Sequence, residues 1–231
     1  MIFIRFLESK LVLITPILVL FSVQISAQKE IYQEIAYNLE EIDIRLLDVD
    51  LIELVSTDES TIAITMQDYV ENSTFLKIKE NNKLITITAS VIEPFQHRVK
   101  TEKYCYVQPL FPTFKIAIPK GCSITVSYSK GNFKAINFEG NLNLSLDTGD
   151  VEINKFKGKL NAELLSGNIN VFIVNTNVGV QSNKGNIQAN FSTVNWQKTK
   201  TSLEGIYGKY INDLKVKAIN ANIVLNSATT Q

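Results

Sequence analysis

The sequence predicts an all-β protein whose strands wind as a β-solenoid, in the form of a single-stranded β-helix. Each coil is expected to take roughly 18 residues, made of two 9-residue halves. Two observations carry this prediction: apolar and polar residues alternate along most of the chain, and glycine recurs at steps of nine or eighteen residues. The recurrent glycines, expected at the corners of the coils, are Gly131, Gly140, Gly149, Gly158, Gly167 and Gly185. An antiparallel β-meander or sandwich is the alternative, because it also joins short strands by tight turns.

The nine-residue period extends beyond glycine. Stepping by nine from Gly131 to Ala221, the following residue is Asn in seven of eleven steps and Asp in two. Both residues tolerate the left-handed conformation of tight turns. The residue after that is apolar in ten of the eleven steps. A solenoid stacks each residue on the residue one coil later and therefore favours such constancy, whereas a meander has no reason to preserve it.

The first 27 residues are predicted to be a signal peptide that is cleaved near Ala27. Arg5 and Lys10 precede the apolar run Leu11–Phe21, and small residues follow it. An uncleaved membrane anchor is the alternative, but the run is short for a span and Pro16 interrupts it. We therefore expect an exported protein, located in the periplasm, on the outer membrane surface or in the medium, with no transmembrane segment after cleavage.

The remainder divides into a β-rich lead-in over 28–118, regular repeats over 119–225 and a polar tail over 226–231. Within the lead-in, alternating segments predict strands, although Gln28–Ile42 could form one or two amphipathic helical turns. Three prolines and clustered aromatic residues near 93–112 predict an insertion or long loop. The period fails near Gln197–Lys209, where the polar sequence predicts another loop.

Three segments resemble a known family. The run "KIAIPKGCSITVSYSKGNFKA" (Lys115–Ala135), followed by "TGDVEI" (Thr148–Ile153) and "SGNINV" (Ser166–Val171), is similar to the bacterial putative-adhesin β-strand repeat family. The resemblance covers roughly Ile42 to Leu225. It implies a single-stranded β-helix and an exported location, and it brings no catalytic residue that could be carried over.

Charge and composition argue against several classes of function. Removing the leader leaves a net charge near −1, without the basic stripe that nucleic-acid binding needs. His97 is the only histidine, so a histidine-based metal site or catalytic triad is not expected. Cys105 and Cys122 lack the spacing of a redox motif, and in an oxidising compartment they could form a disulfide. Two unrelated buried thiols are the alternative, and no cofactor is predicted.

The repeat lacks the residues that metal binding or catalysis would need. Only Asp150 and Asp213 place an aspartate at the turn position, whereas Ca²⁺ requires six to eight oxygen ligands. A polysaccharide-cleaving β-helix enzyme needs clustered carboxylates. Glu152 is the only acid among the seven positions that follow the turns by three residues, from Lys134 to Gln188. We therefore predict no enzymatic activity.

The predicted function is that of an exported, adhesin-like or cell-envelope interaction module, with a cell-surface glycan or an envelope protein as its partner. A structural subunit that assembles end to end, as a homo-oligomer through the solenoid ends, is the second hypothesis, and a β-helix polysaccharide-active enzyme is the third. Candidate surface-contact residues are the aromatic ones, which could instead cover the core or cap an end of the solenoid. They are Tyr104, Tyr106, Phe111, Tyr207 and Tyr210.

Overall fold

The computed structural model shows an all-β protein, as the alternation predicted. It describes residues 28–38, 41–69, 72, 74–81, 83–91, 110–193 and 195–227, and this part of the chain contains fourteen strands and no helix. All fourteen strands belong to one mixed sheet, and one path of paired strands through it runs from β1 to β12. The predicted leader, His97 and Cys105 lie outside the described residues.

The strands vary in length from short edge pieces to one that passes through several turns of the chain. They are β1 (Gln28–Ala36), β2 (Glu41–Arg45), β3 (Leu51–Thr57), β4 (Thr61–Tyr69), β5 (Thr74–Asn81), β6 (Leu84–Val91), β7 (Thr113–Pro119), β8 (Cys122–Lys130), β9 (Asn132–Ile173), β10 (Thr176–Ser182), β11 (Ile187–Ala189), β12 (Gln197–Lys198), β13 (Ser202–Tyr207) and β14 (Asn212–Ser227).

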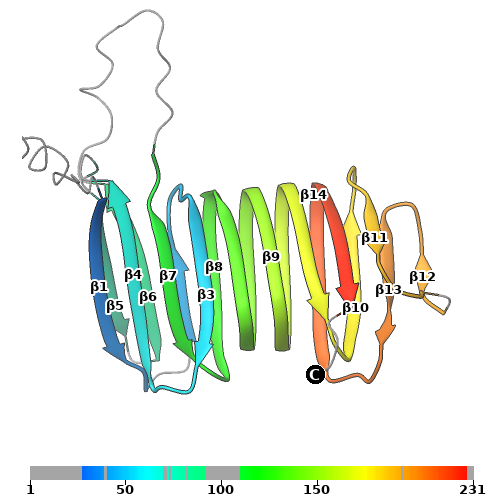
Figure 1. Cartoon of the computed structure of the whole chain (residues 1–231), viewed down its shortest axis with the longest axis horizontal. Coiled ribbons are helices and arrows are strands. Elements are labelled where there is room, and N and C mark those ends of the chain that lie inside the picture. The colour runs from blue at the N-terminus through cyan, green and yellow to red at the C-terminus, as the bar shows by residue number, and fades with distance from the viewer. Residues whose placement is uncertain are drawn as a thin grey trace, which may run out of the picture.

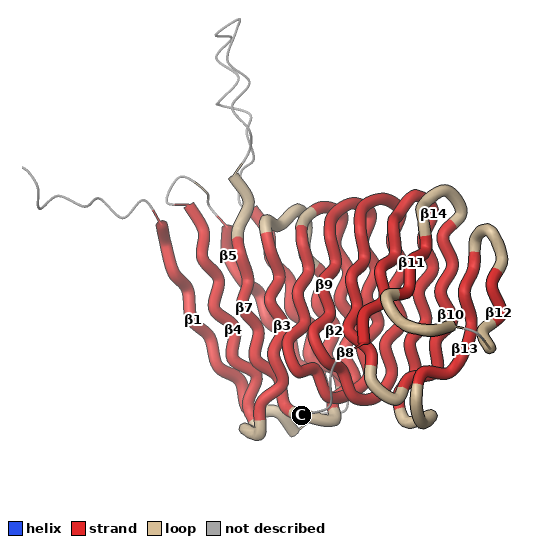
Figure 2. The backbone as a smooth tube through the Cα atoms, turned by 45° about the vertical axis from the view of Figure 1, so that its right-hand side comes forward, coloured by secondary structure: helices blue, strands red, loops and turns tan. Residues whose placement is uncertain are grey.

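Two rows of paired strands run along the long axis of the molecule (Figure 1). One row is β1-β4-β7-β3-β9, and the other is β5-β6-β2-β8-β9. Both rows continue into β9 and β14, since these strands run on through the corners. Pairing is parallel in the middle of the molecule and antiparallel towards both ends, where β1 meets β4, β5 meets β6 and β10 meets β13. Figure 2 shows the same strands side by side as a continuous tube.

Residues 18 apart lie beside one another in the middle of the sheet. Strands β8 and β9 pair in parallel from Cys122 with Gly140 to Lys130 with Thr148. Side chains at the same spacing also accept hydrogen bonds from the backbone. The backbone amide of Asp150 donates to Asn132 Oδ1 at 3.2 Å, and the backbone amide of Asn168 donates to Asp150 Oδ1 at 3.0 Å. The periodic Asn and Asp residues thus form a ladder along one corner of the molecule.

Two strands from the beginning of the chain are inserted between strands that come later in the sequence. Strand β3 lies between β7 and β9, and β2 lies between β6 and β8. At the other end β14 lies between β9 and β10, pairing in parallel with both. Spatial order therefore differs from chain order near both ends.

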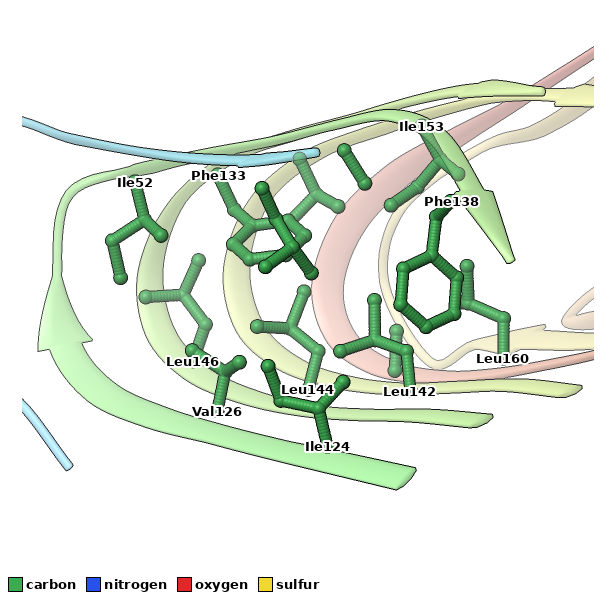
Figure 3. Close-up of a cluster of buried hydrophobic side chains, with 14 of the residues drawn as sticks. Ile52, Ile124, Val126, Phe133, Phe138, Leu142, Leu144, Leu146, Ile153 and Leu160 are labelled. Carbon is green, nitrogen blue, oxygen red and sulfur yellow. The ribbon is translucent and has the colours of Figure 1, made fainter. Parts of the chain in front are cut away.

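The alternating apolar side chains fill the space between the two rows. Figure 3 shows the ribbon curving around this cluster, with Ile124 and Val126 of β8 near Leu142, Leu144 and Leu146 of β9. The labelled side chains come from strands far apart in sequence and lie within one continuous core. Removing such side chains from water stabilises the fold by about 1.5–3 kcal/mol each.

Glycines stack at the corners because the backbone comes very close there. Gly149 has a φ of +155°, and a Cβ added to it would overlap the carbonyl oxygen of Gly131. Gly167, with a φ of +143°, has the same relation to the carbonyl oxygen of Gly149. Only glycine accommodates both this conformation and this approach without displacing a neighbour.

Three local expectations differ from the structure. Gln28–Ala36 forms β1 rather than helical turns, because Ile31 and Ile35 alternate with exposed polar residues and pack against the core. The segment predicted as a polar loop near 197–209 contains β12 and β13, which form an antiparallel hairpin. Its turn is closed by a bond from the Thr199 amide to the Ser202 carbonyl. Strand β14 also reaches Ser227, two residues into the predicted tail.

Candidate functional site

A groove of about 900 Å³ lies at the end of the molecule where the nine-residue period fails. We call it the Gly179 groove. Strands β10, β13 and β14 form most of it, and the segment before β12 completes it. Its lining residues are Asn177, Val178, Gly179, Val180, Gln181, Ser192, Asn195, Trp196, Gln197, Glu204, Gly205, Ile206, Tyr207, Gly208, Leu214, Lys215, Val216 and Lys217.

The strands that form the groove present alternate residues to the core and to solvent. Val178 and Val180 of β10 are buried, as are Leu214 and Val216 of β14. Side chains at the intervening positions therefore face outward. The outward residues of the three strands include Gln181, Glu204, Ile206, Lys215 and Lys217, all of which are exposed.

Gly179 makes a gap in this outward face. Nothing lies within 4 Å of the position that its Cβ would occupy. Its two cross-strand neighbours are Lys215 on β14 and Glu204 on β13. These neighbours are two strand spacings apart, about 10 Å, so their charged groups flank the gap. In the part of the chain that the structure describes, neither takes part in an ion pair.

Asp213 fixes two residues beside the gap. Its Oδ1 accepts a hydrogen bond from Asn177 Nδ2 at 3.0 Å, and its Oδ2 accepts one from the hydroxyl of Tyr210 at 3.1 Å. The bond to Asp213 raises the pKa of Tyr210. Ile206 is the cross-strand neighbour of Asn177 on the other side. An aromatic ring, an amide and an aliphatic side chain are thus held next to the gap.

Asn175 holds the turn that carries Tyr210. Its φ is +48°, its Oδ1 accepts a hydrogen bond from the Lys209 amide at 2.9 Å, and its carbonyl oxygen accepts bonds from the Ile211 and Asn212 amides. Tyr210 and Ile211 are 63% and 60% exposed on this fixed turn. The apolar surface beside the groove is therefore preorganised by the backbone.

An aromatic cluster supports the groove from the core side. The ring of Trp196 lies directly over Gly205, and Phe191 contacts both Trp196 and Tyr207, with centroids 5.4 and 4.6 Å apart. Tyr207 is only partly exposed and packs against the core. Of the two tyrosines predicted here as surface contacts, Tyr210 is available to a ligand and Tyr207 mainly closes the end of the core.

The remaining predicted site residues lie elsewhere. Phe111 sits near the start of β7, with Lys130 Nζ 5.9 Å from its ring centre. Tyr104, Tyr106 and Cys105 are outside the described residues, so the disulfide stays a prediction. Cys122 is a buried thiol, and burial raises its pKa to about 11.

Residues weighed for metal binding or catalysis are also separate from the groove. Glu152 lies on β9, with its carboxylate 3.8 Å from Lys134 Nζ, and also accepts a hydrogen bond from Asn154. Among the described residues no group of three or more His, Cys, Asp or Glu side chains could hold a metal ion. The same part of the chain contains no helix with the length and apolarity needed to cross a membrane.

Sequence reasoning missed Gly179, Asn177, Lys215 and Glu204 as a group. A signal was present: Gly179 is the only glycine among the seven positions that follow the turns by three residues. The structure places those positions on the outward face, so a glycine there removes a surface side chain. The pairing of β10 with β13 and β14, which assembles the other three residues, could not be read from spacing.

Comparison with solved structures relates the fold to a protein of similar architecture. A putative cell adhesion protein from Clostridium sporogenes matches with a TM-score of 0.63 and 17% identity, covering 87% of this chain and all of that one. A putative adhesin from Bacteroides fragilis (10% identity, TM-score 0.30) and a putative lipid binding protein from Parabacteroides distasonis (12%, 0.30) each cover 87% of this chain and 97% of theirs. No protein-family model and no curated protein matches the chain. At these identities the first likeness concerns the fold alone.

Proposed function

We propose that this protein is an exported, non-enzymatic β-solenoid that binds a component of a cell surface or envelope through the Gly179 groove. The observation that carries the proposal is the groove itself: an otherwise regular outward face has a gap at Gly179, flanked by unpaired charges and by a preorganised tyrosine. Binding sites combine concave shape with a few fixed polar groups in this way. The role is adhesin-like in the sense that binding occurs without turnover.

The solenoid winding is supported by the pairing of residues 18 apart in parallel register, as between Cys122 and Gly140. It is also supported by the stacking of Gly131, Gly149 and Gly167 at the same spacing. Export is supported by the basic, apolar and small-residue order of the first 27 residues. The shared fold with a protein described as a cell adhesion protein agrees with this role.

A binding role fits the groove better than hydrolysis. Glycoside hydrolysis uses two carboxyl groups on either side of the scissile bond. Among the described lining residues Glu204 is the only carboxylate. Asp213 lies beside the groove, but hydrogen bonds to Asn177 and Tyr210 occupy both of its oxygens.

The test compares the wild-type protein with Gly179→Val in binding to fractionated envelope material and to a panel of surface glycans. The substitution fills the gap without a steric conflict, since its Cβ meets nothing within 4 Å, and valine favours a strand. We expect saturable binding by the wild-type protein and loss of binding by Gly179→Val, whose thermal stability should be no lower than that of the wild type. Equal binding by both proteins, or turnover of a bound glycan, would refute the proposal. N-terminal sequencing that begins at Gln28 checks the predicted cleavage.

A further inference from the structure

The charges around the gap are unequal on its two sides. Lys217 has Glu163 as a cross-strand neighbour on β9, whereas Lys215 has Asn161 on β9 and Gly179 on β10. Lys215 therefore has no acidic residue directly opposite it on either adjacent strand. The nearest acid on its own strand is Asp213, whose oxygens are already bonded to Asn177 and Tyr210. Lys215 is the cation of this face that is best placed to bind an anion from solution.

Glu204, on the opposite side of the gap, has a different chemical capability. As an ionised carboxylate it accepts hydrogen bonds and repels a second anion. Gln181 and Asn177 lie on β10 between the two charged residues and offer amide donors and acceptors. A ligand in the gap would therefore carry an anionic group on the Lys215 side and hydroxyl donors on the Glu204 side.

The apolar side chains at the border of the groove offer a flat surface for the ring of a ligand. Tyr210 is 63% exposed, and its hydroxyl is held by Asp213 at 3.1 Å, which limits the orientations of the ring. Ile206, which is 53% exposed, lies on β13 directly opposite Asn177 of β10. Aromatic side chains with one fixed polar end offer a flat apolar face without further loss of conformational freedom. The face of a sugar ring matches such a surface, and its hydroxyls match the amides beside it.

We propose that the Gly179 groove binds a carboxylated glycan. One uronic-acid unit occupies the gap, with its carboxylate on Lys215, its hydroxyls on Asn177, Gln181 and Glu204, and its ring against Tyr210. This ligand assignment rests on the proposed function of the same groove and adds the chemical class of its ligand. Charge complementarity at Lys215 and the acceptor at Glu204 set both the class and the orientation of the ligand.

The experiment is calorimetric titration of the exported full chain with a galacturonic acid trisaccharide and with its carboxyl-reduced, neutral counterpart. We expect the acidic trisaccharide to bind at least tenfold more tightly, and its affinity to fall as NaCl is raised from 0.05 to 0.5 M. Lys215→Gln should weaken binding about five- to tenfold, and Tyr210→Leu should weaken it for both trisaccharides. Lys77→Gln is the matched control, because Lys77 is an exposed lysine of β5 at the far end of the molecule, and it should bind as the wild type.

The outcomes separate the ligand class from the broader function. Equal affinity for the two trisaccharides, with no effect of Lys215→Gln, would overturn the assignment of a carboxylate to the ligand. In that case, loss of binding in Gly179→Val would still support the groove as the binding site. Failure of both trisaccharides to bind also overturns this inference. The proposed function fails separately, if Gly179→Val leaves binding to envelope material and to the glycan panel unchanged. Unchanged circular dichroism spectra of all variants exclude unfolding as the cause of any loss.

Discussion

Gly149 and Gly179 form a matched pair for testing how the molecule is built. Both lie in strands, but a Cβ added to Gly149 would overlap the carbonyl oxygen of Gly131, 18 residues earlier, whereas one added to Gly179 meets nothing within 4 Å. Gly149 also has a φ of +155°, a conformation that residues with a side chain rarely adopt. We therefore expect Gly149→Ala and Gly179→Ala to change stability in opposite directions.

The magnitudes follow from these two environments. For Gly149→Ala, the backbone conformation costs about 1–3 kcal/mol and displacing the neighbouring backbone costs roughly another 1–3 kcal/mol. The total loss is about 2–6 kcal/mol. For Gly179→Ala there is neither cost, and the reduced freedom of the unfolded chain raises the free energy of unfolding by about 0.4–1 kcal/mol.

Urea unfolding followed by circular dichroism measures both changes. A shift of the midpoint at constant slope reports a change in stability rather than in the surface exposed. Gly167→Ala should resemble Gly149→Ala, because its Cβ would overlap the carbonyl oxygen of Gly149. If Gly149→Ala stays within about 0.5 kcal/mol of the wild type, or if the Gly149 and Gly179 variants lose the same stability, residues 18 apart do not stack as closely as the structure shows.

Three further predictions concern the inserted strand, the buried thiol and the ends of the molecule. Leu225→Ala on β14 should lose about 2–5 kcal/mol in urea unfolding because Leu225 is fully buried, whereas Ile219→Ala, 46% exposed on the same strand, should lose less than about 0.5 kcal/mol. The pKa of Cys122 is raised to about 11 in the folded protein. The buried thiol therefore makes its full contribution to the free energy of unfolding below pH 9 and loses it as the pH rises towards 11. In the Cys122→Ala variant, the decline of the free energy of unfolding with rising pH should be smaller by up to roughly 2.5 kcal/mol. If the denatured, unreduced wild-type protein contains no reactive thiol, Cys122 is instead bridged to Cys105. Sedimentation should give a concentration-independent monomer, since antiparallel pairs terminate the parallel stack at both ends; association that grows with concentration would favour the end-to-end subunit.

Much of the fold was accessible from the sequence because one local rule repeats. The residue two positions after each periodic glycine points into the core, as Leu142, Val151 and Ile169 do. The rule needs only the two-residue alternation of strands and a turn of constant length. It lost its predictive value near β13, because a hairpin in the same alternating pattern looks, by composition alone, like a polar loop.

The candidate site was less accessible, because it depends on residues that meet only through strand order. The period fails near Gln197–Lys209, at the end of the molecule that carries the groove, and Tyr210, predicted as a candidate surface contact, is 63% exposed there. Lys215 and Glu204 flank Gly179 only because β14 and β13 are the two neighbours of β10. The period puts Gly179 and Lys215 in the same register, 36 residues apart, but it does not show that β14 and β13 are the neighbours of β10.

Strand order is the property that the nine-residue period leaves undetermined. Leu160, Val178 and Leu214 occupy the same position of the period, and the structure places Leu214 between the other two. The register is the same whether Leu160 meets the residue 18 or 54 positions later, since every 18-residue period presents the same apolar face. The choice is made by contacts outside the period, such as the bonds by which Asn175 holds the turn before β14. As a result the last strand in sequence has parallel partners on both sides, and releasing it requires breaking two ladders rather than one.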